Sequence, residues 1–307
     1  MDGEGPDGRV LLATCADYPD GDGDHRGLPD ACARLGIGTG WAVWDDPRVD
    51  WSSAALVVVR STWDYTERCG QFLGWAAAVD RLANPAGVLA WSADKTYLLD
   101  LAATGVPVVP TAVLAGDDLP DLGGADLVVK PSVGAGSVGA GRFPADDPAA
   151  AARARAHAAD LRAHGRTVLV QPYLDGVDRS GETDLVFLDG AYSHAVRKGA
   201  MLTGSTVNRF DGPGAGDLFV PERIRPAAAT AEELAVATRA LAAVPGPHPL
   251  LYARVDLLPG PDGPVVNEVE LVEPSLFLGH APGSTDRLAA GIARRLGLKP
   301  GGEPVDT

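Results

Sequence analysis

The sequence has few cysteines, little basic charge and no long apolar run. Its three cysteines, Cys15, Cys32 and Cys69, are odd in number and form no Cys-x-x-Cys pair, so we expect reduced thiols rather than disulfides or a zinc site. No apolar run approaches the ~18 residues of a membrane span. The first eight residues are acidic and rich in glycine, unlike a secretory signal. These absences predict a cytoplasmic protein with no membrane partner.

Basic residues are scarce as well. The 307 residues include 26 Lys and Arg against 41 Asp and Glu, which gives a formal net charge of −15. Such a surface repels nucleic acid and anionic lipid, so we expect neither as a partner. Any site for a polyanion must gather its few cations locally. A chain of this length has room for two or three lobes with sizeable cores.

The first part of the chain alternates strand-like and helix-like segments. Strands are expected at three short apolar runs, Val10–Thr14, Trp41–Trp44 and Leu56–Arg60. A helix face is marked by apolar residues at helical spacing, namely Phe72, Trp75, Val79 and Leu82. This alternation favours a small parallel sheet with helices on its faces.

The remaining chain predicts two further lobes. Between residues 106 and 171 we expect a lid made of short strands, a glycine-rich hairpin and a helix from the N-cap Asp147 to Gly165. After it, the sequence predicts an antiparallel sheet with a helix at about 230–243, where Thr230 and Glu233 form a capping box.

Three carboxylates lie on a predicted hairpin near the C-terminus. Tyr252–Asp256 and Val265–Leu271 are predicted as antiparallel strands joined by a Gly/Pro turn. Side chains alternate along a strand, so Glu268 and Glu270 share a face, and the partner strand can bring Asp256 onto it. Such carboxylates are unfavourable to bury together unless a cation lies between them, and hard oxygen ligands suit Mg²⁺. A solvated polar strand face is the alternative.

A glycine-rich hairpin follows a lysine upstream. Asp126–Lys130 is predicted as a buried strand that continues into Ser132–Gly141, with glycines at 134, 136, 139 and 141. Successive glycines let backbone N–H groups approach a phosphate and leave a loop mobile enough to act as a lid. No Lys-Ser or Lys-Thr follows the last glycine, and Gly141–Phe143 continues as a strand, so neither a Walker A motif nor a dinucleotide fingerprint is present. The combination indicates a cover over a triphosphate; a linker is the alternative.

Four further segments complete an ordered set. The first is Asp94-Lys95, in a predicted helix from the N-cap Ser92 to Gly105. The others are a strand over Thr167–Leu174, Gly181-Glu182 before a second strand, and Ser193–Lys198 at the end of a third strand. With Lys130 and the two hairpins, this order resembles the ATP-grasp superfamily of carboxylate–amine ligases. The resemblance implies an α/β fold of α+β lobes. Its parts would be a Rossmann-like pre-ATP-grasp domain at 1–90, a glycine-loop lid domain at 91–172 and a catalytic antiparallel-sheet domain at 173–307.

The resemblance also implies roles for individual residues. ATP would be held by lysines, the glycine loop, an adenine hinge and a ribose-binding carboxylate: Lys95, Lys130, Ser132, Gly136, Ser137, Gly139, Gln171, Pro172, Tyr173, Leu174, and Asp175 or Asp178. Lys198 and Arg254 would be catalytic, because they would neutralise the transferred phosphoryl group. Two Mg²⁺ ions would be held by Asp256, Glu268 and Glu270, with Glu268 shared, although the family usually has Asn in place of Glu270. A homodimer is implied as well.

A narrower resemblance rests on short phrases along the chain. A subgroup of small ATP-grasp ligases, which includes the O-ureido-serine cyclo-ligase of D-cycloserine biosynthesis, has similar phrases to Val10–Cys15, Trp44–Trp51, Leu56–Tyr65, Asn84-Pro85, Tyr192–Gly199 and Glu270–Phe277. The resemblance implies a ligase of antibiotic biosynthesis. It would activate a small amino acid derivative as an acyl phosphate, and a nitrogen of the same molecule would close a ring.

Substrate contacts are expected just past the carboxyl end of a buried strand, where open α/β sheets bind ligands, and from a histidine near Lys198. The candidates are Arg60, Ser61, Thr62, Asp64 and His194. Arg60 would fix a carboxylate and Asp64 could receive an ammonium group. The Gly-rich segment Met201–Phe219 does not align with the subgroup and is expected to face substrate.

The sequence leaves two alternatives open. One is an intermolecular carboxylate–amine ligase of the peptide type, and the other is a non-catalytic ATP-binding regulatory protein. The full set of three carboxylates and four cations favours an enzyme, because a protein that had lost turnover would be expected to lose a metal ligand.

Overall fold

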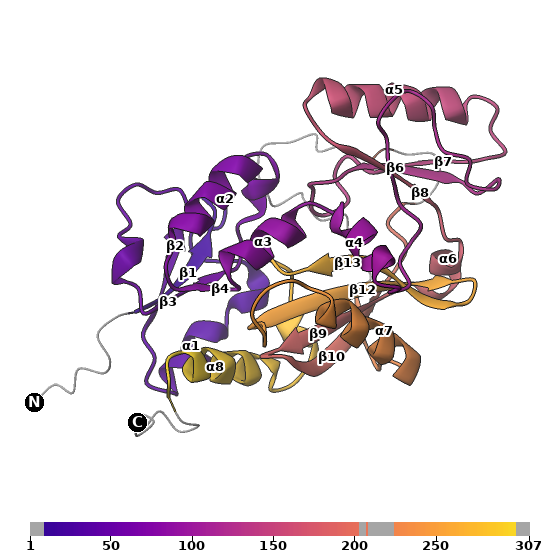
Figure 1. Cartoon of the computed structure of the whole chain (residues 1–307). Coiled ribbons are helices and arrows are strands. Elements are labelled where there is room, and N and C mark those ends of the chain that lie inside the picture. Colours follow the sequence, from indigo (N-terminus) through magenta and orange to yellow (C-terminus); the bar gives the residue numbers. More distant parts are fainter. Residues whose placement is uncertain (1–8, 203–206, 208–223, 299–307) are drawn as a thin grey trace, which may run out of the picture.

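The molecule contains three sheets, and the sheet formed by the C-terminal part of the chain lies between the N-terminal sheet and the sheet formed by the middle of the chain (Figure 1). The computed structural model describes residues 9–202, 207 and 224–298. Most of the segment 201–219, which the sequence predicts to face substrate, therefore lies outside the described residues. None of the helices in these ranges is both long and apolar enough to cross a membrane. The three cysteines form no disulfide, as expected.

The N-terminal sheet is parallel, as predicted. Its strands are β1 (Val10–Thr14), β2 (Thr39–Val43), β3 (Leu56–Val59) and β4 (Leu82–Ala83), in the order β2-β1-β3-β4. Alternate residues serve opposite faces: Leu12 and Val58 pack with α1 (Leu28–Ala33), while Ala13, Val57 and Val59 pack with α2 (Cys69–Ala78). The short buried runs of β1 and β3 are typical of a sheet covered on both faces.

Two helix predictions in this region are wrong in extent. Helix α2 ends at Ala78, because Val79 is extended and Leu82 pairs with Val57 as the first residue of β4. A single helix from Ser92 to Gly105 is also wrong. The chain forms α3 (Ala86–Ala93) and α4 (Tyr97–Ala103), separated by Asp94 in an extended conformation.

Ser92 is not an N-cap but a link to the C-terminal hairpin. It lies in the last turn of α3, where its hydroxyl donates to the Val269 carbonyl at 2.9 Å and accepts from the Leu271 N–H at 3.1 Å. The strand thus holds the end of α3 in place. Gly105 follows α4 with φ +78°, so the predicted stop is confirmed.

The middle sheet is antiparallel and lies beneath one long helix (Figure 1). Its order is β5-β8-β6-β7, formed by β5 (Ala112–Val113), β6 (Leu127–Pro131), β7 (Gly141–Phe143) and β8 (Val168–Pro172). Helix α5 (Ala150–Ala163) packs on it through Ala150, Ala154 and Ala158. Its N-cap is Ala149 rather than Asp147, because the Asp147 carboxylate accepts from the Ala149 N–H at 2.8 Å and forms a turn before the helix.

The C-terminal sheet is antiparallel, as predicted. Its order is β11-β10-β9-β12-β13, formed by β9 (Glu182–Leu188), β10 (Ala191–Lys198), β11 (Arg225–Ala227), β12 (Tyr252–Gly260) and β13 (Gly263–Glu270). The short α6 (Gly176–Ser180) precedes it, and α7 (Ala231–Ala242) has the predicted Thr230–Glu233 capping box. Helix α8 (Ser284–Arg295) returns to pack beside α1 (Figure 1).

Asn84 joins the N-terminal and C-terminal sheets at a fully buried position. Its amide donates to the carbonyls of Tyr252 at 2.9 Å and Leu271 at 3.0 Å, and its Oδ1 accepts from the Leu251 N–H at 2.9 Å. One side chain therefore satisfies three backbone groups that have no access to water.

We expect Asn84→Ala to lower the free energy of unfolding by about 3 kcal/mol, because it leaves three buried backbone groups unpaired. Thermal unfolding should show the loss as a lower midpoint. Ser53→Ala, which removes one exposed hydrogen bond to the Asp50 carbonyl, serves as the control and should leave the midpoint nearly unchanged. A midpoint for Asn84→Ala equal to that of the control would contradict this role.

Candidate active site

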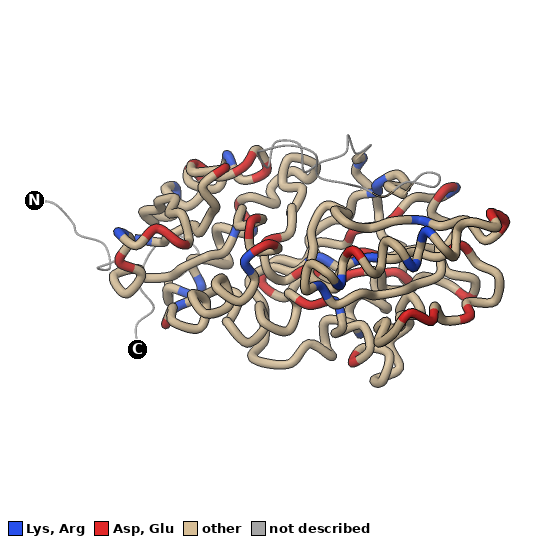
Figure 2. Tube along the Cα trace, turned by 90° about the horizontal axis from the view of Figure 1, so that it is seen from above, with Lys and Arg blue, Asp and Glu red and all other residues tan. Residues whose placement is uncertain are grey.

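A cavity lies between the middle sheet and the C-terminal sheet, where charged segments of both signs interleave (Figure 2). Many predicted site residues line it: Lys95, Lys130, Gly136, Ser137, Gln171, Pro172, Tyr173, Leu174, Lys198, Arg254, Asp256, Glu268 and Glu270. Others lie outside its lining: Arg60, Ser61, Thr62, Asp64, Ser132, Gly139, Asp175, Asp178 and His194.

Three carboxylates converge at the floor of the cavity through the register of β12 and β13. Asp256 lies opposite Glu268, and a bulge follows this pair. Val269 points into the core while Glu268 and Glu270 line the cavity, as strand alternation predicts. Asp256, Glu268 and Glu270 each offer an oxygen within 4.8 Å of the others.

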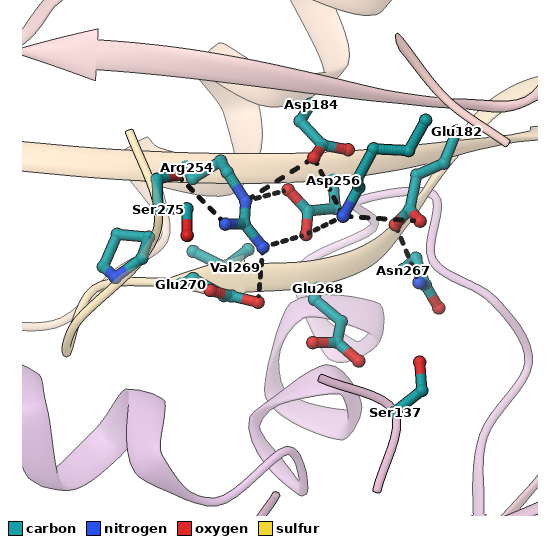
Figure 3. Close-up of polar contacts among 12 residues, drawn as sticks. Ser137, Glu182, Asp184, Arg254, Asp256, Asn267, Glu268, Val269, Glu270 and Ser275 are labelled. Carbon is teal, nitrogen blue, oxygen red and sulfur yellow. Dashed lines mark hydrogen bonds and ion pairs between the residues drawn. The ribbon is translucent and has the colours of Figure 1, made fainter. Parts of the chain in front are cut away.

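Arg254 neutralises two of these carboxylates (Figure 3). Its guanidinium donates to both Asp256 oxygens, at 2.7 and 2.8 Å, and to Glu270 Oε1 at 2.6 Å. It also lies over the Phe277 ring, 5.3 Å from the centroid. Burial nevertheless raises the pKa of Glu270 to about 8, and the charges of Asp256 and Glu268 add to this effect.

Glu268 is paired with lysines instead. Its carboxylate lies 3.3 Å from Lys130 Nζ on β6 and 3.6 Å from Lys95 Nζ, which precedes α4. Burial alone would raise the pKa of Glu268, but the two lysine charges outweigh it and lower that pKa to about 2. The pKa values of the two glutamates on this face of β13 are therefore shifted in opposite directions by their surroundings.

A second acidic group lies on β9 beside the first. Glu182 and Asp184 point to one face two residues apart, and Asp184 lies opposite Asp256 in the sheet. Lys198 Nζ lies among them, 2.9 Å from Asp184, 3.8 Å from Glu182 and 3.9 Å from Asp256. Although burial opposes its charge, these carboxylates hold the pKa of Lys198 well above its ordinary value.

Sequence reasoning missed Asp184. The spacing Glu182-Thr-Asp184 was available as a signal, because it places both carboxylates on one strand face. What the sequence does not show is that this face meets Asp256. The Asp184 side chain is fully buried, and burial together with Asp256 raises its pKa well above the ordinary value.

The donor set at the floor fits Mg²⁺. Its members are carboxylate oxygens that lie close enough to share an ion, and the protein's own arginine and lysines offset their charge. Hard oxygen donors of this kind suit Mg²⁺, which completes its shell with water and phosphate oxygens. The residues that would hold it are Asp256, Glu268 and Glu270.

The glycine hairpin lies over the cavity and is tied at both ends. Gly136, Ser137 and Gly139 have positive φ, a backbone conformation that glycine adopts without strain. Lys95 Nζ donates to the Gly134 carbonyl, and His157 on α5 contacts the Gly139 carbonyl at 2.8 Å. His157 is half-buried and supports the hairpin from α5. The buried Ser132 supports the loop through its backbone, which bonds Lys95 and Thr167.

The hinge at the end of β8 lines the opposite wall. Gln171 is fixed by a hydrogen bond from Nε2 to the Thr111 hydroxyl at 2.9 Å. Arg142 stacks over the Tyr173 ring at 3.5 Å. The Tyr173 hydroxyl donates to Asp178 at 2.5 Å. Asp175 instead lies 3.1 Å from Arg179 on exposed α6, so neither predicted ribose carboxylate lies in the cavity wall.

Four of the predicted substrate residues, Arg60, Ser61, Thr62 and His194, are buried, and Asp64 is half-buried. Trp63, next to them in the sequence, lines the cavity. Arg60 is fully buried over the Tyr252 ring and donates to the Pro274 carbonyl at 2.6 Å and to His25 Nε2 at 3.2 Å. Its Nη1 has no hydrogen-bond partner in the part of the chain that the structure describes.

The other predicted substrate residues differ in how many hydrogen-bond partners their side chains have. Asp64 accepts from Trp44 Nε1 at 2.8 Å and from Arg68. The His194 ring contacts the Leu276 carbonyl at 2.9 Å. Within the described residues, the Thr62 hydroxyl lacks a partner although it is fully buried. Asp64 would have to release one of its partners to receive an ammonium group.

Comparisons with known proteins agree with this geometry. Residues 10–84 match the family described as the N-terminal domain of D-cycloserine synthetase DcsG. The chain is 41% identical over 310 residues to the cycloserine biosynthesis protein DcsG of Streptomyces lavendulae, covering 94% of this chain and 99% of that protein. The crystal structure of D-cycloserine synthetase DcsG superposes with a TM-score of 0.81 and 39% identity, over 94% of this chain and 100% of that one.

A more distant structure supports the fold alone. The D-alanine–D-alanine ligase of Bacillus anthracis matches with a TM-score of 0.64 at 15% identity, over 94% of this chain and 97% of that one. The predicted α/β fold of ATP-grasp type is thereby confirmed, and ATP-grasp ligases use ATP and Mg²⁺. The chain is a ligase that belongs to the DcsG family of the ATP-grasp superfamily.

Proposed function

We propose that the protein converts O-ureido-D-serine to D-cycloserine with ATP, releasing ADP and phosphate. The observation that carries this proposal is the match to DcsG along almost the whole chain, combined with a cavity where three carboxylates and four cations converge. The carboxylate of the substrate would take the γ-phosphoryl group and become an acyl phosphate.

Phosphoryl transfer in this site depends on positioning and charge. We propose that Lys95, Lys130 and the glycine hairpin hold the phosphates, and that Gln171–Leu174 hold the adenine through backbone groups. Lys198 and Arg254 would neutralise the transferred phosphoryl group, without a covalent enzyme intermediate. Two bound Mg²⁺ ions would offset charge on the phosphate oxygens. Arg254 would then exchange its contacts with Asp256 and Glu270 for contacts with the phosphoryl group.

The substrate would lie at the end of the cavity next to Trp63. Arg60, Ser61, Thr62 and His194 would form the polar wall behind it, and the unpaired Arg60 Nη1 supports a polar ligand there. In O-ureido-D-serine, the nitrogen bonded to oxygen can reach the activated carbonyl carbon and close a five-membered ring. Holding both groups in one molecule removes the need to bind a second amine. One water molecule then removes the carbamoyl group as carbon dioxide and ammonia.

Three further features belong to this proposal. ATP as co-substrate and unpaired cysteines favour the cytoplasm, and similarity to the superfamily favours a homodimer. The division into domains at 1–90, 91–172 and 173–307 follows the three sheets, although α8 packs back on α1.

The proposal predicts that O-ureido-D-serine, ATP and Mg²⁺ are sufficient for ADP formation, because the attacking nitrogen is already in the substrate. ADP release is measured with this compound alone and with a panel of amino acids added as second substrates. ADP that forms only when an added amine is present would support an intermolecular ligase and contradict cyclisation.

A further inference from the structure

Glu273 is a carboxylate of the cavity to which the proposed binding of ATP and metal assigns no role. It lies in the segment after β13, and its side chain lines the cavity while 5% exposed. It belongs to neither of the two acidic groups with metal-ligand spacing among the described residues. It also makes no ion pair and no side-chain hydrogen bond with another described residue.

The segment around Glu273 is held firmly by its backbone. Arg60 Nη2 donates to the Pro274 carbonyl at 2.6 Å, and Arg254 Nη1 donates to the Ser275 carbonyl at 3.1 Å. Figure 3 shows Ser275 beside the Arg254 guanidinium, on the side of Glu270. The backbone that follows Glu273 is therefore anchored by Arg60, one of the predicted substrate residues, and by Arg254, which would neutralise the phosphoryl group.

The ring closure proposed above needs a proton acceptor at this place. When the nitrogen attacks the acyl phosphate, an N–C bond forms and the bond between the carbonyl carbon and the phosphate oxygen breaks. Phosphate leaves with the electron pair, and the nitrogen must lose its proton. Lys95, Lys130, Lys198 and Arg254 cannot accept it while charged, and Asp256, Glu268 and Glu270 would be occupied by metal. Glu182, which also lines the cavity, accepts a hydrogen bond from Asn267 at 3.0 Å and lies 3.8 Å from Lys198 Nζ.

We propose that Glu273 is the general base that accepts the proton from the attacking nitrogen during ring closure. This inference rests on the function proposed above and adds the residue that makes its second step possible. After product release, the protonated carboxyl returns its proton to water.

The electrostatic surroundings fit this task. Burial raises the pKa of Glu273 to about 7, against the opposing charges of Lys95, Arg254 and Arg60. The carboxylates of Glu270 and Glu273 act on each other, and Tyr65 and Tyr252 are further titratable neighbours. A base whose pKa lies near the working pH combines a large ionised fraction with useful basicity.

The test separates acyl phosphate formation from ring closure. Glu273→Gln keeps the shape of the side chain and removes its basicity, and Glu67→Gln on the exposed surface is the matched control. Wild-type enzyme and both variants are given O-ureido-D-serine, ATP and Mg²⁺. The ADP formed in the first turnover and the ring product are quantified. In parallel reactions, hydroxylamine traps the acyl phosphate as a hydroxamate.

We expect Glu273→Gln to retain first-turnover ADP and hydroxamate, because neither needs this base, while ring product falls by about 10²–10⁴-fold. Wild-type ring closure should rise with pH through about 7 and level off above it, since only the ionised carboxylate accepts a proton. The glutamine variant should lack this rise, and the control should match the wild type.

Two results would overturn the inference. If hydroxamate and ring product fall in parallel in Glu273→Gln, Glu273 acts in substrate binding or in acyl phosphate formation. A raised KM with unchanged kcat in this variant would likewise indicate substrate binding. Wild-type enzyme that forms neither hydroxamate nor ADP from this compound would instead overturn the proposed function on which the inference rests.

Discussion

Replacing Glu268 by glutamine is expected to lower turnover by on the order of 10³-fold or more, because it removes a charge that two metal ions would share. The change keeps the shape of the side chain, so the β12–β13 register and the fold should persist. It also leaves Lys95 and Lys130, at 3.6 and 3.3 Å in the wild type, without their acidic partner. Without that carboxylate the two lysines repel each other, and the negative charge of ATP relieves this repulsion, so nucleotide binding in the metal-free state should be at least as tight as in the wild type.

Steady-state ADP release measures the effect on turnover. Titration of the protein with ATP, with and without Mg²⁺, measures the effect on nucleotide binding. The matched control is Glu232→Gln, an exposed residue in the first turn of α7. We expect turnover to be lost and circular dichroism to be unchanged in Glu268→Gln. Turnover close to that of the control would show that Glu268 is not a shared metal ligand.

Replacing Arg254 by lysine is expected to lower the rate of acyl phosphate formation by about 10²–10³-fold. The guanidinium spans Asp256 and Glu270 with a planar fork, a geometry that an ammonium group cannot reproduce. Lysine keeps the positive charge, so Asp184, Asp256 and Glu270 are not left uncompensated in a buried site. Alanine would leave them so and would be expected to destabilise the fold.

Single-turnover ADP formation is the measurement for this variant. Arg239→Lys, at an exposed position of α7, is the control, because its guanidinium donates to the Gly105 carbonyl and neither residue lines the cavity. Wild-type single-turnover rates in Arg254→Lys would show that any cation suffices at this position and would contradict its role in neutralising the phosphoryl group.

The parts of the site that the sequence predicts correctly are those encoded locally. Strand alternation places Glu268 and Glu270 on one face, and a short turn brings Asp256 opposite, so the hairpin follows from neighbouring residues. The Thr230–Glu233 capping box is local in the same sense. Such features depend on contacts within a few residues, and periodicity and capping rules describe them well.

The parts that it does not predict depend on partners far along the chain. Ser92 reads locally as an N-cap, yet its hydroxyl bonds Val269, 177 residues later. Asp184 gains its place at the site from pairing with Asp256 across β9 and β12, and Asp64 is engaged by Trp44 and Arg68. Glu273 lies in the phrase Glu270–Phe277, but no periodicity or ligand spacing assigns it a role, because the proposed role depends on where the segment after β13 meets Arg60 of the N-terminal part of the chain.

The most direct test of the account follows the carboxylate oxygens of the substrate. O-ureido-D-serine labelled with ¹⁸O in its carboxyl group is converted with unlabelled ATP and Mg²⁺, with no second amine present. If the carboxylate is phosphorylated and a nitrogen of the same molecule displaces phosphate, the released phosphate carries one ¹⁸O atom and D-cycloserine retains the other. Unlabelled phosphate, or label in phosphate only when an external amine is added, would contradict cyclisation through an acyl phosphate.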